Sequence, residues 1–166
     1  MKALIKNVAD ELMPTIKQHG LVIKFTDDGQ PTYLIKADAG KVKQVVGNLI
    51  DNAIKYTPKG TIEVKLSKDK EKGELHIAIK DSGVGIPKET LPNLFQKFSR
   101  DRKANEVNVM GTGLGLYVAR ELIHGHHGEV WAESEGVGKG STFQVMLPLD
   151  QHFEHVEAVT ELAKAM

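Results

Sequence analysis

The sequence contains no cysteine among its 166 residues. That absence excludes disulfide bonds and cysteine-ligated metal sites, and it is compatible with a reducing cytoplasm, where we expect the chain to work. Neither sign of charge is in excess, because 22 Lys and Arg balance 22 Asp and Glu. A neutral chain has no basic footprint for nucleic acid and no electrostatic attraction to an anionic membrane.

Long apolar segments are also missing. No run approaches the roughly 20 residues that a membrane helix needs. The first residues, Met1 to Glu11, mix charged and apolar side chains at helical spacing, which is not the pattern of a signal peptide. With 40% hydrophobic residues, the chain can bury a core of ordinary size. We expect one domain at 1–150, followed by a tail at 151–166 that either forms an amphipathic helix or is disordered.

Hydrophobic periodicity predicts alternating helices and strands. Helices are expected at 2–18, with a kink or restart at Pro14, at 38–54, at 91–98 and at 114–123. Strands are expected at 21–26, 33–36, 62–66, 75–79, 129–133 and 141–149. Two of the strand pairs read as hairpins, so we predict an α/β (α+β) two-layer sandwich with a mixed, mainly antiparallel sheet under one layer of helices.

One face of the predicted second helix carries polar side chains. Asn48, Asn52 and Lys55 fall within a narrow wedge of the helix surface, away from the apolar stripe, and Tyr56 borders them. An amide oxygen can ligate a hard cation such as Mg²⁺, and a lysine can place its charge on phosphate. Taken alone, this pattern is more often an ordinary solvated helix face.

Asp81-Ser-Gly-Val-Gly-Ile-Pro87 follows a predicted strand directly. A carboxylate at a strand end can accept a hydrogen bond from the exocyclic amine of adenine. Gly83 and Gly85 allow the backbone to bend and to approach a flat ring closely. A glycine-rich turn without a ligand is the competing interpretation.

Gly111-Thr-Gly-Leu-Gly-Leu116 opens the last predicted helix. Backbone N–H groups at a helix N-terminus can bind phosphate, and glycines allow close approach to the anion. The spacing fits neither the dinucleotide fingerprint nor a Walker A loop. The preceding polar segment, 99–113, is long enough to indicate a functional or mobile loop. Phe95 and Phe98 beside it read as core or as a hinge anchor, and Arg100 as a surface charge.

These weak signals become specific through their order. Asn48–Thr57, Asp81–Pro87, Leu94–Phe98, Gly111–Leu116 and Gly140–Phe143 resemble the N, G1, F, G2 and glycine-threonine boxes of sensor histidine kinases. The resemblance covers about 1–149. It implies the Bergerat fold, in which nucleotide lies between the helices and a mobile ATP lid, here 96–113, with 1–18 as a leading helical segment.

The resemblance also implies roles for residues. Asn52 would be the main Mg²⁺ ligand with Asn48 near the metal, and Lys55 and Tyr56 would face the phosphates of ATP. Asn48, Lys55 and Arg100 would be the catalytic residues. Asp81 would bind the adenine amine. The remaining nucleotide contacts would come from Gly83, Gly85, Ile86, Phe98, Gly111, Thr112, Gly113, Leu114, Gly115, Leu116 and Thr142. Related hydrolytic ATPases carry a glutamate where this chain has Asn48, which cannot act as a base near neutral pH.

None of the seven histidines is followed by Asp or Glu, so the phospho-acceptor motif of a whole kinase is missing. We therefore expect an excised, monomeric catalytic domain whose partners are a histidine-bearing dimerisation domain and, indirectly, a response regulator. The alternatives are a serine kinase of the anti-sigma-factor type and a regulatory module that binds nucleotide without transferring phosphate. A hydrolytic motor is the least favoured.

Overall fold

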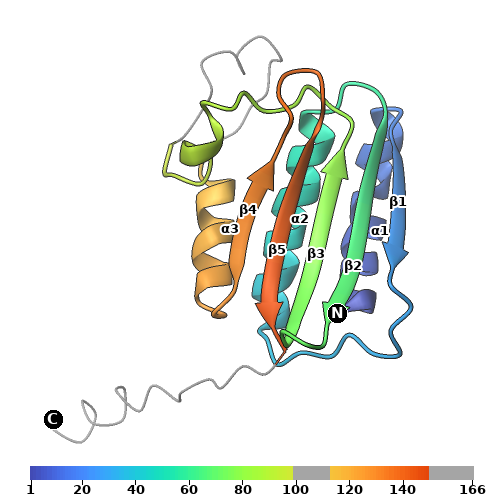
Figure 1. Ribbon diagram of the computed structural model, residues 1–166. Coiled ribbons are helices and arrows are strands. Elements are labelled where there is room, and N and C mark those ends of the chain that lie inside the picture. The colour runs from blue at the N-terminus through green and yellow to red at the C-terminus, as the bar shows by residue number, and fades with distance from the viewer. Residues whose placement is uncertain (99–112, 150–166) are drawn as a thin grey trace, which may run out of the picture.

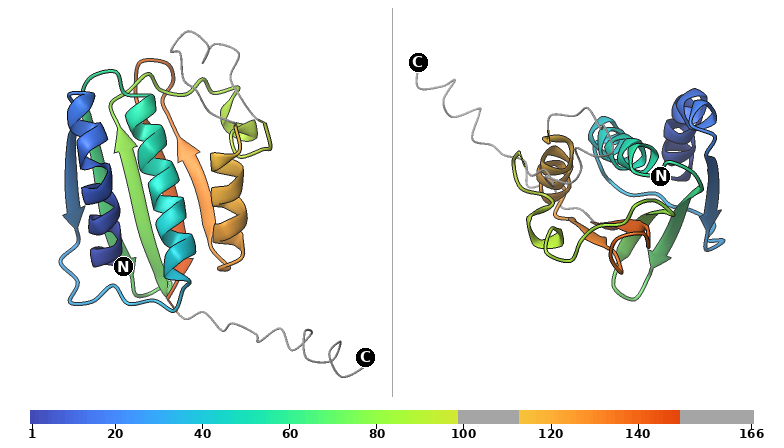
Figure 2. Two further views of the ribbon diagram at one scale, coloured as in Figure 1. Left: turned by 180° about the vertical axis from the view of Figure 1, so that it is seen from behind. Right: turned by 90° about the horizontal axis from the view of Figure 1, so that it is seen from above.

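The computed structural model describes residues 1–98 and 113–149, and their strands form one five-stranded sheet in the order β1-β2-β3-β5-β4. The helices α1, α2 and α3 lie side by side on one face of this sheet (Figures 1 and 2). In chain order, the elements are α1 (Lys2–Gln18), β1 (Val22–Asp27), α2 (Ala39–Lys55), β2 (Thr61–Asp69), β3 (Glu74–Asp81), the short 3₁₀ helix η1 (Leu91–Asn93), α3 (Gly115–His124), β4 (Glu129–Glu133) and β5 (Ser141–Pro148). The predicted two-layer α/β class is confirmed. Within these ranges, no helix combines the length and apolarity that crossing a bilayer demands.

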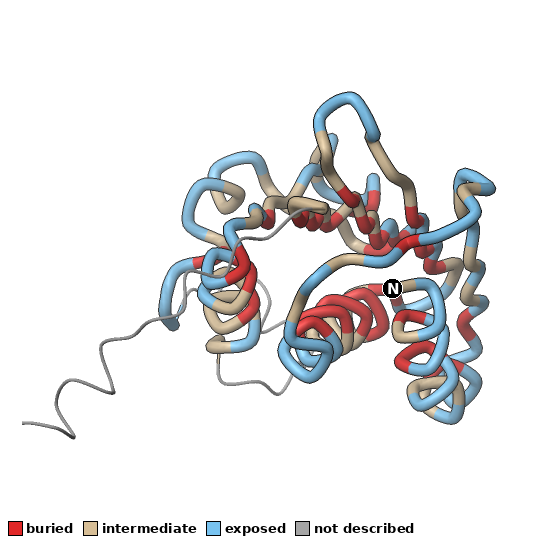
Figure 3. The backbone as a smooth tube through the Cα atoms, turned by 90° about the horizontal axis from the view of Figure 1, so that it is seen from below, coloured by how far each residue is buried: buried red, intermediate tan, exposed pale blue. Residues whose placement is uncertain are grey.

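The central helix, α2, forms where the apolar repeat predicts it. Asp38 caps its N-terminus, because the Asp38 carboxylate accepts a hydrogen bond from the backbone N–H of Lys41 at 3.0 Å. One stripe of the helix is buried against the sheet. This stripe consists of Val42, Val45, Val46, Leu49, Ile50, Ala53 and Ile54. The tube in Figure 3 shows the same arrangement, with buried segments of the helices facing buried segments of the sheet.

The sheet is mixed. β1 pairs with β2 in parallel, whereas the β2–β3, β3–β5 and β4–β5 pairs are antiparallel. Side chains alternate along each strand, so one face packs on the helices. The buried residues of that face include Ile62, Val64, Leu66, Leu75, Ile77, Ile79, Phe143, Val145 and Leu147. Alternation therefore fixes which side chains at the strand ends face the helices.

Three local predictions are wrong. Residues 33–36 form no strand, because Tyr33 instead turns inward and is buried beside β1. Of the kink or restart predicted at Pro14, the restart is wrong, since α1 runs as one helix through that position. Of the helix predicted at 91–98, only the 3₁₀ turn Leu91–Asn93 forms, with a proline in its first turn. At Tyr33, burial of the side chain in the core overrides the short strand pattern.

A hydrogen-bonded corner replaces the predicted strand. The Tyr33 hydroxyl donates to the carboxylates of Asp28 and Asp27, the latter at 3.2 Å. Lys2 forms an ion pair with Asp27 at 2.6 Å. The hydrogen bond from Lys2 is the main cause that lowers the pKa of Asp27, and the bond from Tyr33 is the main cause that lowers the pKa of Asp28. Burial and the bond to Asp28 raise the pKa of Tyr33 to about 12. This corner anchors the loop that leads into α2.

The Tyr33 hydroxyl predicts a loss of stability at high pH. Between the ordinary pKa of 10.0 and about 12, the unfolded chain loses the phenolic proton while the folded chain keeps it. The unfolded state then binds fewer protons, so the free energy of unfolding falls as pH rises through this window. We expect Tyr33→Phe to flatten this fall in urea titrations between pH 9 and pH 12 (a range chosen about the tyrosine pKa). An equally steep slope in Tyr33→Phe would contradict the assignment.

Two contacts join α2 and α3 at opposite ends. His126 is buried; its Nε2 accepts a hydrogen bond from the backbone N–H of Asp38 at 3.1 Å, and its Nδ1 lies 2.7 Å from the carbonyl of Leu122. α3 ends in a Schellman motif, in which Gly128 N–H donates to the Ile123 carbonyl at 3.0 Å and His127 has a φ of 54°. At the other end, the amide of Asn48 donates to the Gly115 carbonyl at 3.3 Å. The two helices are thus held in register.

Candidate functional site

The predicted site residues gather at one end of the sheet. There the C-terminus of α2, the end of β3, the start of β5 and the N-terminus of α3 lie close together, at the top of Figure 1. The direction of the chain brings these segments together, because α2 and β3 both run towards this end of the sheet and β5 and α3 both start from it. Arg100, Gly111 and Thr112, most of the expected lid 96–113, and the tail 151–166 lie outside the described residues.

Asp81 ends β3 with a buried carboxylate that is only 3% exposed. One carboxylate oxygen, Oδ1, accepts hydrogen bonds from the backbone N–H groups of Gly83 at 2.8 Å and Ser141 at 3.3 Å. The other, Oδ2, accepts a bond from the Ser141 hydroxyl. A carboxylate offers about four acceptor positions, so about one remains for a donor on a ligand. An exocyclic amine is the kind of donor that fits this position.

The loop after Asp81 is fitted closely to its surroundings. A Cβ atom on Gly83 would lie 2.1 Å from the Tyr56 carbonyl, so only glycine fits there. Gly85 has a φ of 72°, and a Cβ on it would lie 2.1 Å from the Gly136 carbonyl. Backbone bonds join Gly138 N–H to the Val84 carbonyl at 2.7 Å and Gly140 N–H to the Gly83 carbonyl at 3.1 Å. Gly83 and Gly85 of the loop after β3 thus pack against Gly136, Gly138 and Gly140 of the loop between β4 and β5. We call these two packed loops around Asp81 the Asp81 wall.

Two serines complete this wall, and the sequence reasoning missed both. Ser134 accepts a bond from the Ile86 N–H at 3.0 Å and donates to the Gly140 carbonyl at 2.7 Å. Ser141 contacts Asp81, as described above. Thr142, the residue that the resemblance favoured, pairs with Lys80 in the β3–β5 ladder, and alternation directs its side chain to the opposite face from Ser141. The inward pattern of Phe143, Val145 and Leu147 was a signal that could have identified Ser141.

The polar wedge of α2 lies beside the N-terminus of α3. Asn48 touches Gly115, and Asn52 and Lys55 follow on the same face, all three half-buried. Lys55 forms an ion pair with Asp51, one helical turn earlier, which the sequence reasoning did not consider. Tyr56 is the C-cap residue of α2, and its carbonyl accepts the Val84 N–H at 3.0 Å. Tyr56 therefore connects the polar face of α2 to the loop that follows Asp81.

The N-terminus of α3 lies where the glycine motif predicts it. Gly113 has a φ of 70°, Leu114 is the N-cap residue, and Gly115 is the first helical residue and is exposed. Leu116 packs against the core. The N–H groups of a first helical turn have no partner within the helix, so this end can bind an anion. It lies next to Asn48 and could share an anion with the α2 wedge.

The two phenylalanines, Phe95 and Phe98, lie in different environments. Phe95 is buried and meets the Phe143 ring edge to face, with ring centroids 6.4 Å apart. Phe98 is 71% exposed and has a φ of 59°. The core interpretation is therefore confirmed for Phe95. Phe98 instead lies at the boundary of the described residues, in a left-handed conformation that is uncommon for an aromatic side chain.

A divalent cation would meet few protein ligands here. Among residues 1–98 and 113–149, no three His, Cys, Asp or Glu side chains come together as a metal site. Mg²⁺ needs only one or two protein oxygens when phosphates and waters supply the rest. The amide oxygens of Asn48 and Asn52 beside an anion-binding helix end fit that requirement.

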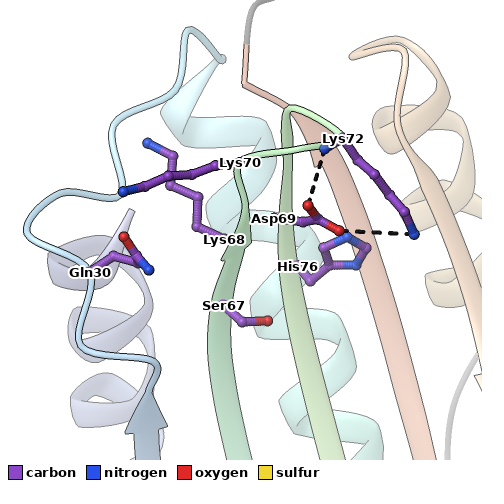
Figure 4. A pocket seen from close by; sticks show the side chains of 7 residues that line it. All are labelled: Gln30, Ser67, Lys68, Asp69, Lys70, Lys72 and His76. Atoms are coloured by element: carbon purple, nitrogen blue, oxygen red, sulfur yellow. Dashed lines mark hydrogen bonds and ion pairs between the residues drawn. The ribbon is translucent and has the colours of Figure 1, made fainter.

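Two hollows lie outside this arrangement. One, of about 570 Å³, is at the opposite end of the sheet, where Ser67 and Asp69 of β2 lie beside His76 of β3 (Figure 4). Its lining is polar and exposed. The other, of about 390 Å³, runs between α1 and α2 and reaches Asn48 and Asp51 at one end. Only the second hollow borders the predicted site.

Sequence comparisons identify known proteins that resemble this chain. The model of histidine kinase-, DNA gyrase B- and HSP90-like ATPases matches residues 37–151, more than half of the chain. The sensor histidine kinase WalK of Bacillus subtilis (strain 168) is 36% identical over 148 residues, which cover 89% of this chain and 24% of WalK. The adaptive-response sensory kinase SasA of Synechococcus sp. (strain JA-3-3Ab) is 35% identical over 90% of this chain and 38% of its own length. The chain thus spans well under half of these relatives.

Comparison with solved structures also identifies histidine kinases as similar proteins. The catalytic domain of the histidine kinase ThkA has a TM-score of 0.77 and 27% identity, covering 90% of this chain and 92% of that chain. The full-length kinase ShkA, solved with the ATP analogue AMPPNP, has a TM-score of 0.78 and 26% identity, covering 90% of this chain and 30% of that chain. The matched fold is that of histidine kinase catalytic domains. The family-model match over residues 37–151 and the similarity to sensor histidine kinases lead to one conclusion: this chain belongs to the family of histidine kinase-, DNA gyrase B- and HSP90-like ATPases.

Proposed function

We propose that the chain is the catalytic domain of a sensor histidine kinase, which binds Mg-ATP and transfers the γ-phosphoryl group to a histidine on a separate dimerisation domain. The observation that carries the proposal is the buried Asp81 carboxylate, which keeps about one acceptor position at the end of the sheet where the α2 wedge and the α3 N-terminus meet. In this arrangement the adenine amine bonds to Asp81. The phosphates extend along Tyr56, Lys55 and Asn52 towards Gly113 and Leu114.

The phosphate end supports transfer rather than hydrolysis. Asn48 occupies the place that a general base holds in related hydrolytic ATPases; its amide is bonded to Gly115, and an amide cannot act as a base near neutral pH. Mg²⁺, held by Asn52 with Asn48 nearby, would neutralise charge on the phosphates when bound. In the reaction, an imidazole nitrogen of the partner attacks the γ-phosphorus, the bond to the bridging oxygen breaks, and ADP leaves.

The wider setting is part of the same proposal. We assign 1–150 to the catalytic domain, with 96–113 as the ATP lid carrying Arg100, Gly111 and Thr112, and we place the reaction in the cytoplasm. The acceptor domain would pass the phosphoryl group on to a response regulator. The related kinase ThkA has been solved in complex with a response regulator protein, TrrA, which supports a response regulator as a partner.

Calorimetric titration with AMPPNP, with and without Mg²⁺, tests the proposal, followed by incubation with ATP and a histidine-bearing dimerisation domain. We expect one saturable site that binds more tightly with Mg²⁺, and phosphoryl transfer to the histidine. Binding without transfer to any such domain would favour a regulatory module. No binding by a folded chain at millimolar analogue would overturn the proposed site.

Asn52→Asp tests the metal assignment. A carboxylate in place of the amide adds negative charge beside the triphosphate, so we expect Mg-ATP affinity to fall about tenfold or more, and transfer to fall with it. Asn7→Asp, on an exposed face of α1, introduces the same charge away from the site and should bind as wild type. Unchanged Mg-ATP binding and transfer in Asn52→Asp would remove Asn52 from the site.

A further inference from the structure

The polar face of α2 carries a negative charge that the proposed site does not use. Asp51 lies beside Asn52 in the sequence, and at about 100° per residue its side chain shares one sector of the helix with Asn48 and Lys55. The Asp51 carboxylate forms an ion pair with the Lys55 ammonium, one turn later. Asp51 and Asn48 both line the hollow of about 390 Å³ between α1 and α2, so the carboxylate borders the place proposed for the phosphates.

The fold does not require a carboxylate at this position. Asp51 lies inside α2 rather than at its cap residues, Asp38 and Tyr56, and its side chain is 43% exposed. Within the ranges that the structure describes, Lys55 is its only ion-pair partner. An exposed pair one turn apart stabilises a helix only slightly. The charge of Asp51 therefore matters more for a ligand that approaches this face than for the helix itself.

The ion pair leaves the C-terminal end of this face without net charge. Lys55 is the α2 cation that would meet the phosphates, and Asp51 cancels its charge before a ligand arrives. A triphosphate without metal is repelled by the Asp51 carboxylate and has to compete with it for Lys55. Mg²⁺ offsets part of the charge of the triphosphate. The same carboxylate therefore disfavours the metal complex less than it disfavours the metal-free ligand.

We propose that Asp51 is a specificity residue of the phosphate site, which selects nucleotide complexed with Mg²⁺ over metal-free nucleotide. This rests on the proposed function and adds to it a residue that touches neither the base nor the metal. The Lys55 ammonium leaves Asp51 for the phosphates most readily when the metal accompanies them. The site thereby favours the form of ATP in which the charge on the transferring group is already partly offset.

Asp51→Asn tests the proposal by calorimetric titration, because asparagine keeps the shape and removes the charge. The affinity for AMPPNP without Mg²⁺ should rise about tenfold. Mg²⁺ offsets about half of the ligand charge, so in its presence the rise should be about threefold, and the enhancement of affinity by Mg²⁺ should fall about threefold. Metal-free tripolyphosphate should gain about as much as metal-free AMPPNP. A role in helix structure alone would not raise the affinity for either ligand.

Salt provides a second measurement. At about 1 M NaCl the Debye length is about 3 Å, so the gain of Asp51→Asn over wild type for metal-free AMPPNP should shrink to less than about threefold. Glu11→Gln is the matched control, because it breaks the ion pair that Glu11 forms with Lys43 at 2.7 Å beside the same hollow, about 12 Å earlier along α2. It should change each affinity by less than about twofold. Asp51→Ala removes the charge without introducing an amide and must give the same pattern as Asp51→Asn.

Failure of this proposal can be told apart from failure of the proposed function. Equal metal-free affinities of Asp51→Asn and wild type would overturn the role of Asp51 and leave the nucleotide site standing. A gain of the same size with and without Mg²⁺ would overturn the selection for the metal complex. Failure of the wild-type chain to bind AMPPNP in the presence of Mg²⁺ would instead overturn the proposed function itself.

Discussion

Asp81→Asn is expected to weaken ADP binding by about 10- to 100-fold while leaving tripolyphosphate binding within about twofold of wild type. The reason is that a hydrogen bond to a charged group contributes about 1.5–3 kcal/mol, and only the base contacts Asp81 in the proposed site. The new NH2 group replaces one carboxylate oxygen, so it would direct N–H donors at either Ser141 Oγ or the backbone N–H of Gly83, each of which already donates to Asp81. Calorimetry with both ligands measures the difference.

Folding must be checked in the same experiment. The amide disturbs a buried cluster, so circular dichroism has to show that Asp81→Asn is folded at the titration temperature. Asp10→Asn, on the exposed face of α1, removes the same charge far from the cluster and serves as the control. Equal losses for ADP and tripolyphosphate would mean that Asp81 does not read the base.

Gly140→Ala should destabilise the domain by about 4 kcal/mol. Gly140 has a φ of 69°, which costs a residue with a side chain about 1 kcal/mol. A Cβ there would also lie 2.1 Å from the Asp81 carbonyl, and relieving a clash with backbone costs about 3 kcal/mol more. The movement would separate β5 from β3 beside Asp81, so nucleotide binding should fail together with stability. Urea unfolding measures the first effect and titration with ADP the second.

Gly138→Ala is the control that separates the cost of the backbone conformation from the cost of the steric clash. Gly138 has a similar φ of 77°, but a Cβ there would meet no atom within 4 Å. We expect a cost of about 1 kcal/mol from backbone conformation alone. If the two alanine variants proved equally stable, the close fit between Gly140 and Asp81 would not be a feature of the protein in solution.

The long elements could be read from the sequence because each carries a repeated pattern. The apolar repeat of α2 and the alternation of β2, β3 and β5 are reinforced over several turns or residue pairs. The four-residue strand predicted at Tyr33 had no such reinforcement. Its apolar residues served another purpose, since the Tyr33 ring fills the core while its hydroxyl holds Asp27 and Asp28. Burial alone does not reveal whether a short segment will find a strand to pair with.

The site could be predicted only at the level of motifs. The resemblance implied one nucleotide site for Asn48, Asp81 and Gly115, and in the structure Asn48 is bonded to Gly115. Two details depended on three-dimensional register. Ser141 rather than Thr142 faces Asp81 because β5 pairs with β3 in one particular register. The pairing of Lys55 with Asp51 depended on side-chain geometry that competes with other partners on the same face.

The pairing of β3 with β5 also has a consequence for how the protein folds. Asp81 lies opposite Ser141 in this ladder, 60 residues away along the chain, so the carboxylate finds its partners only after a long loop has closed. Contacts of such separation form slowly and late in small domains. A chain with α1, β1, α2 and the β2–β3 hairpin already assembled would still have an unfinished base pocket. Capacity to bind nucleotide should therefore be the last property to appear during refolding, and its appearance would report that the sheet is complete.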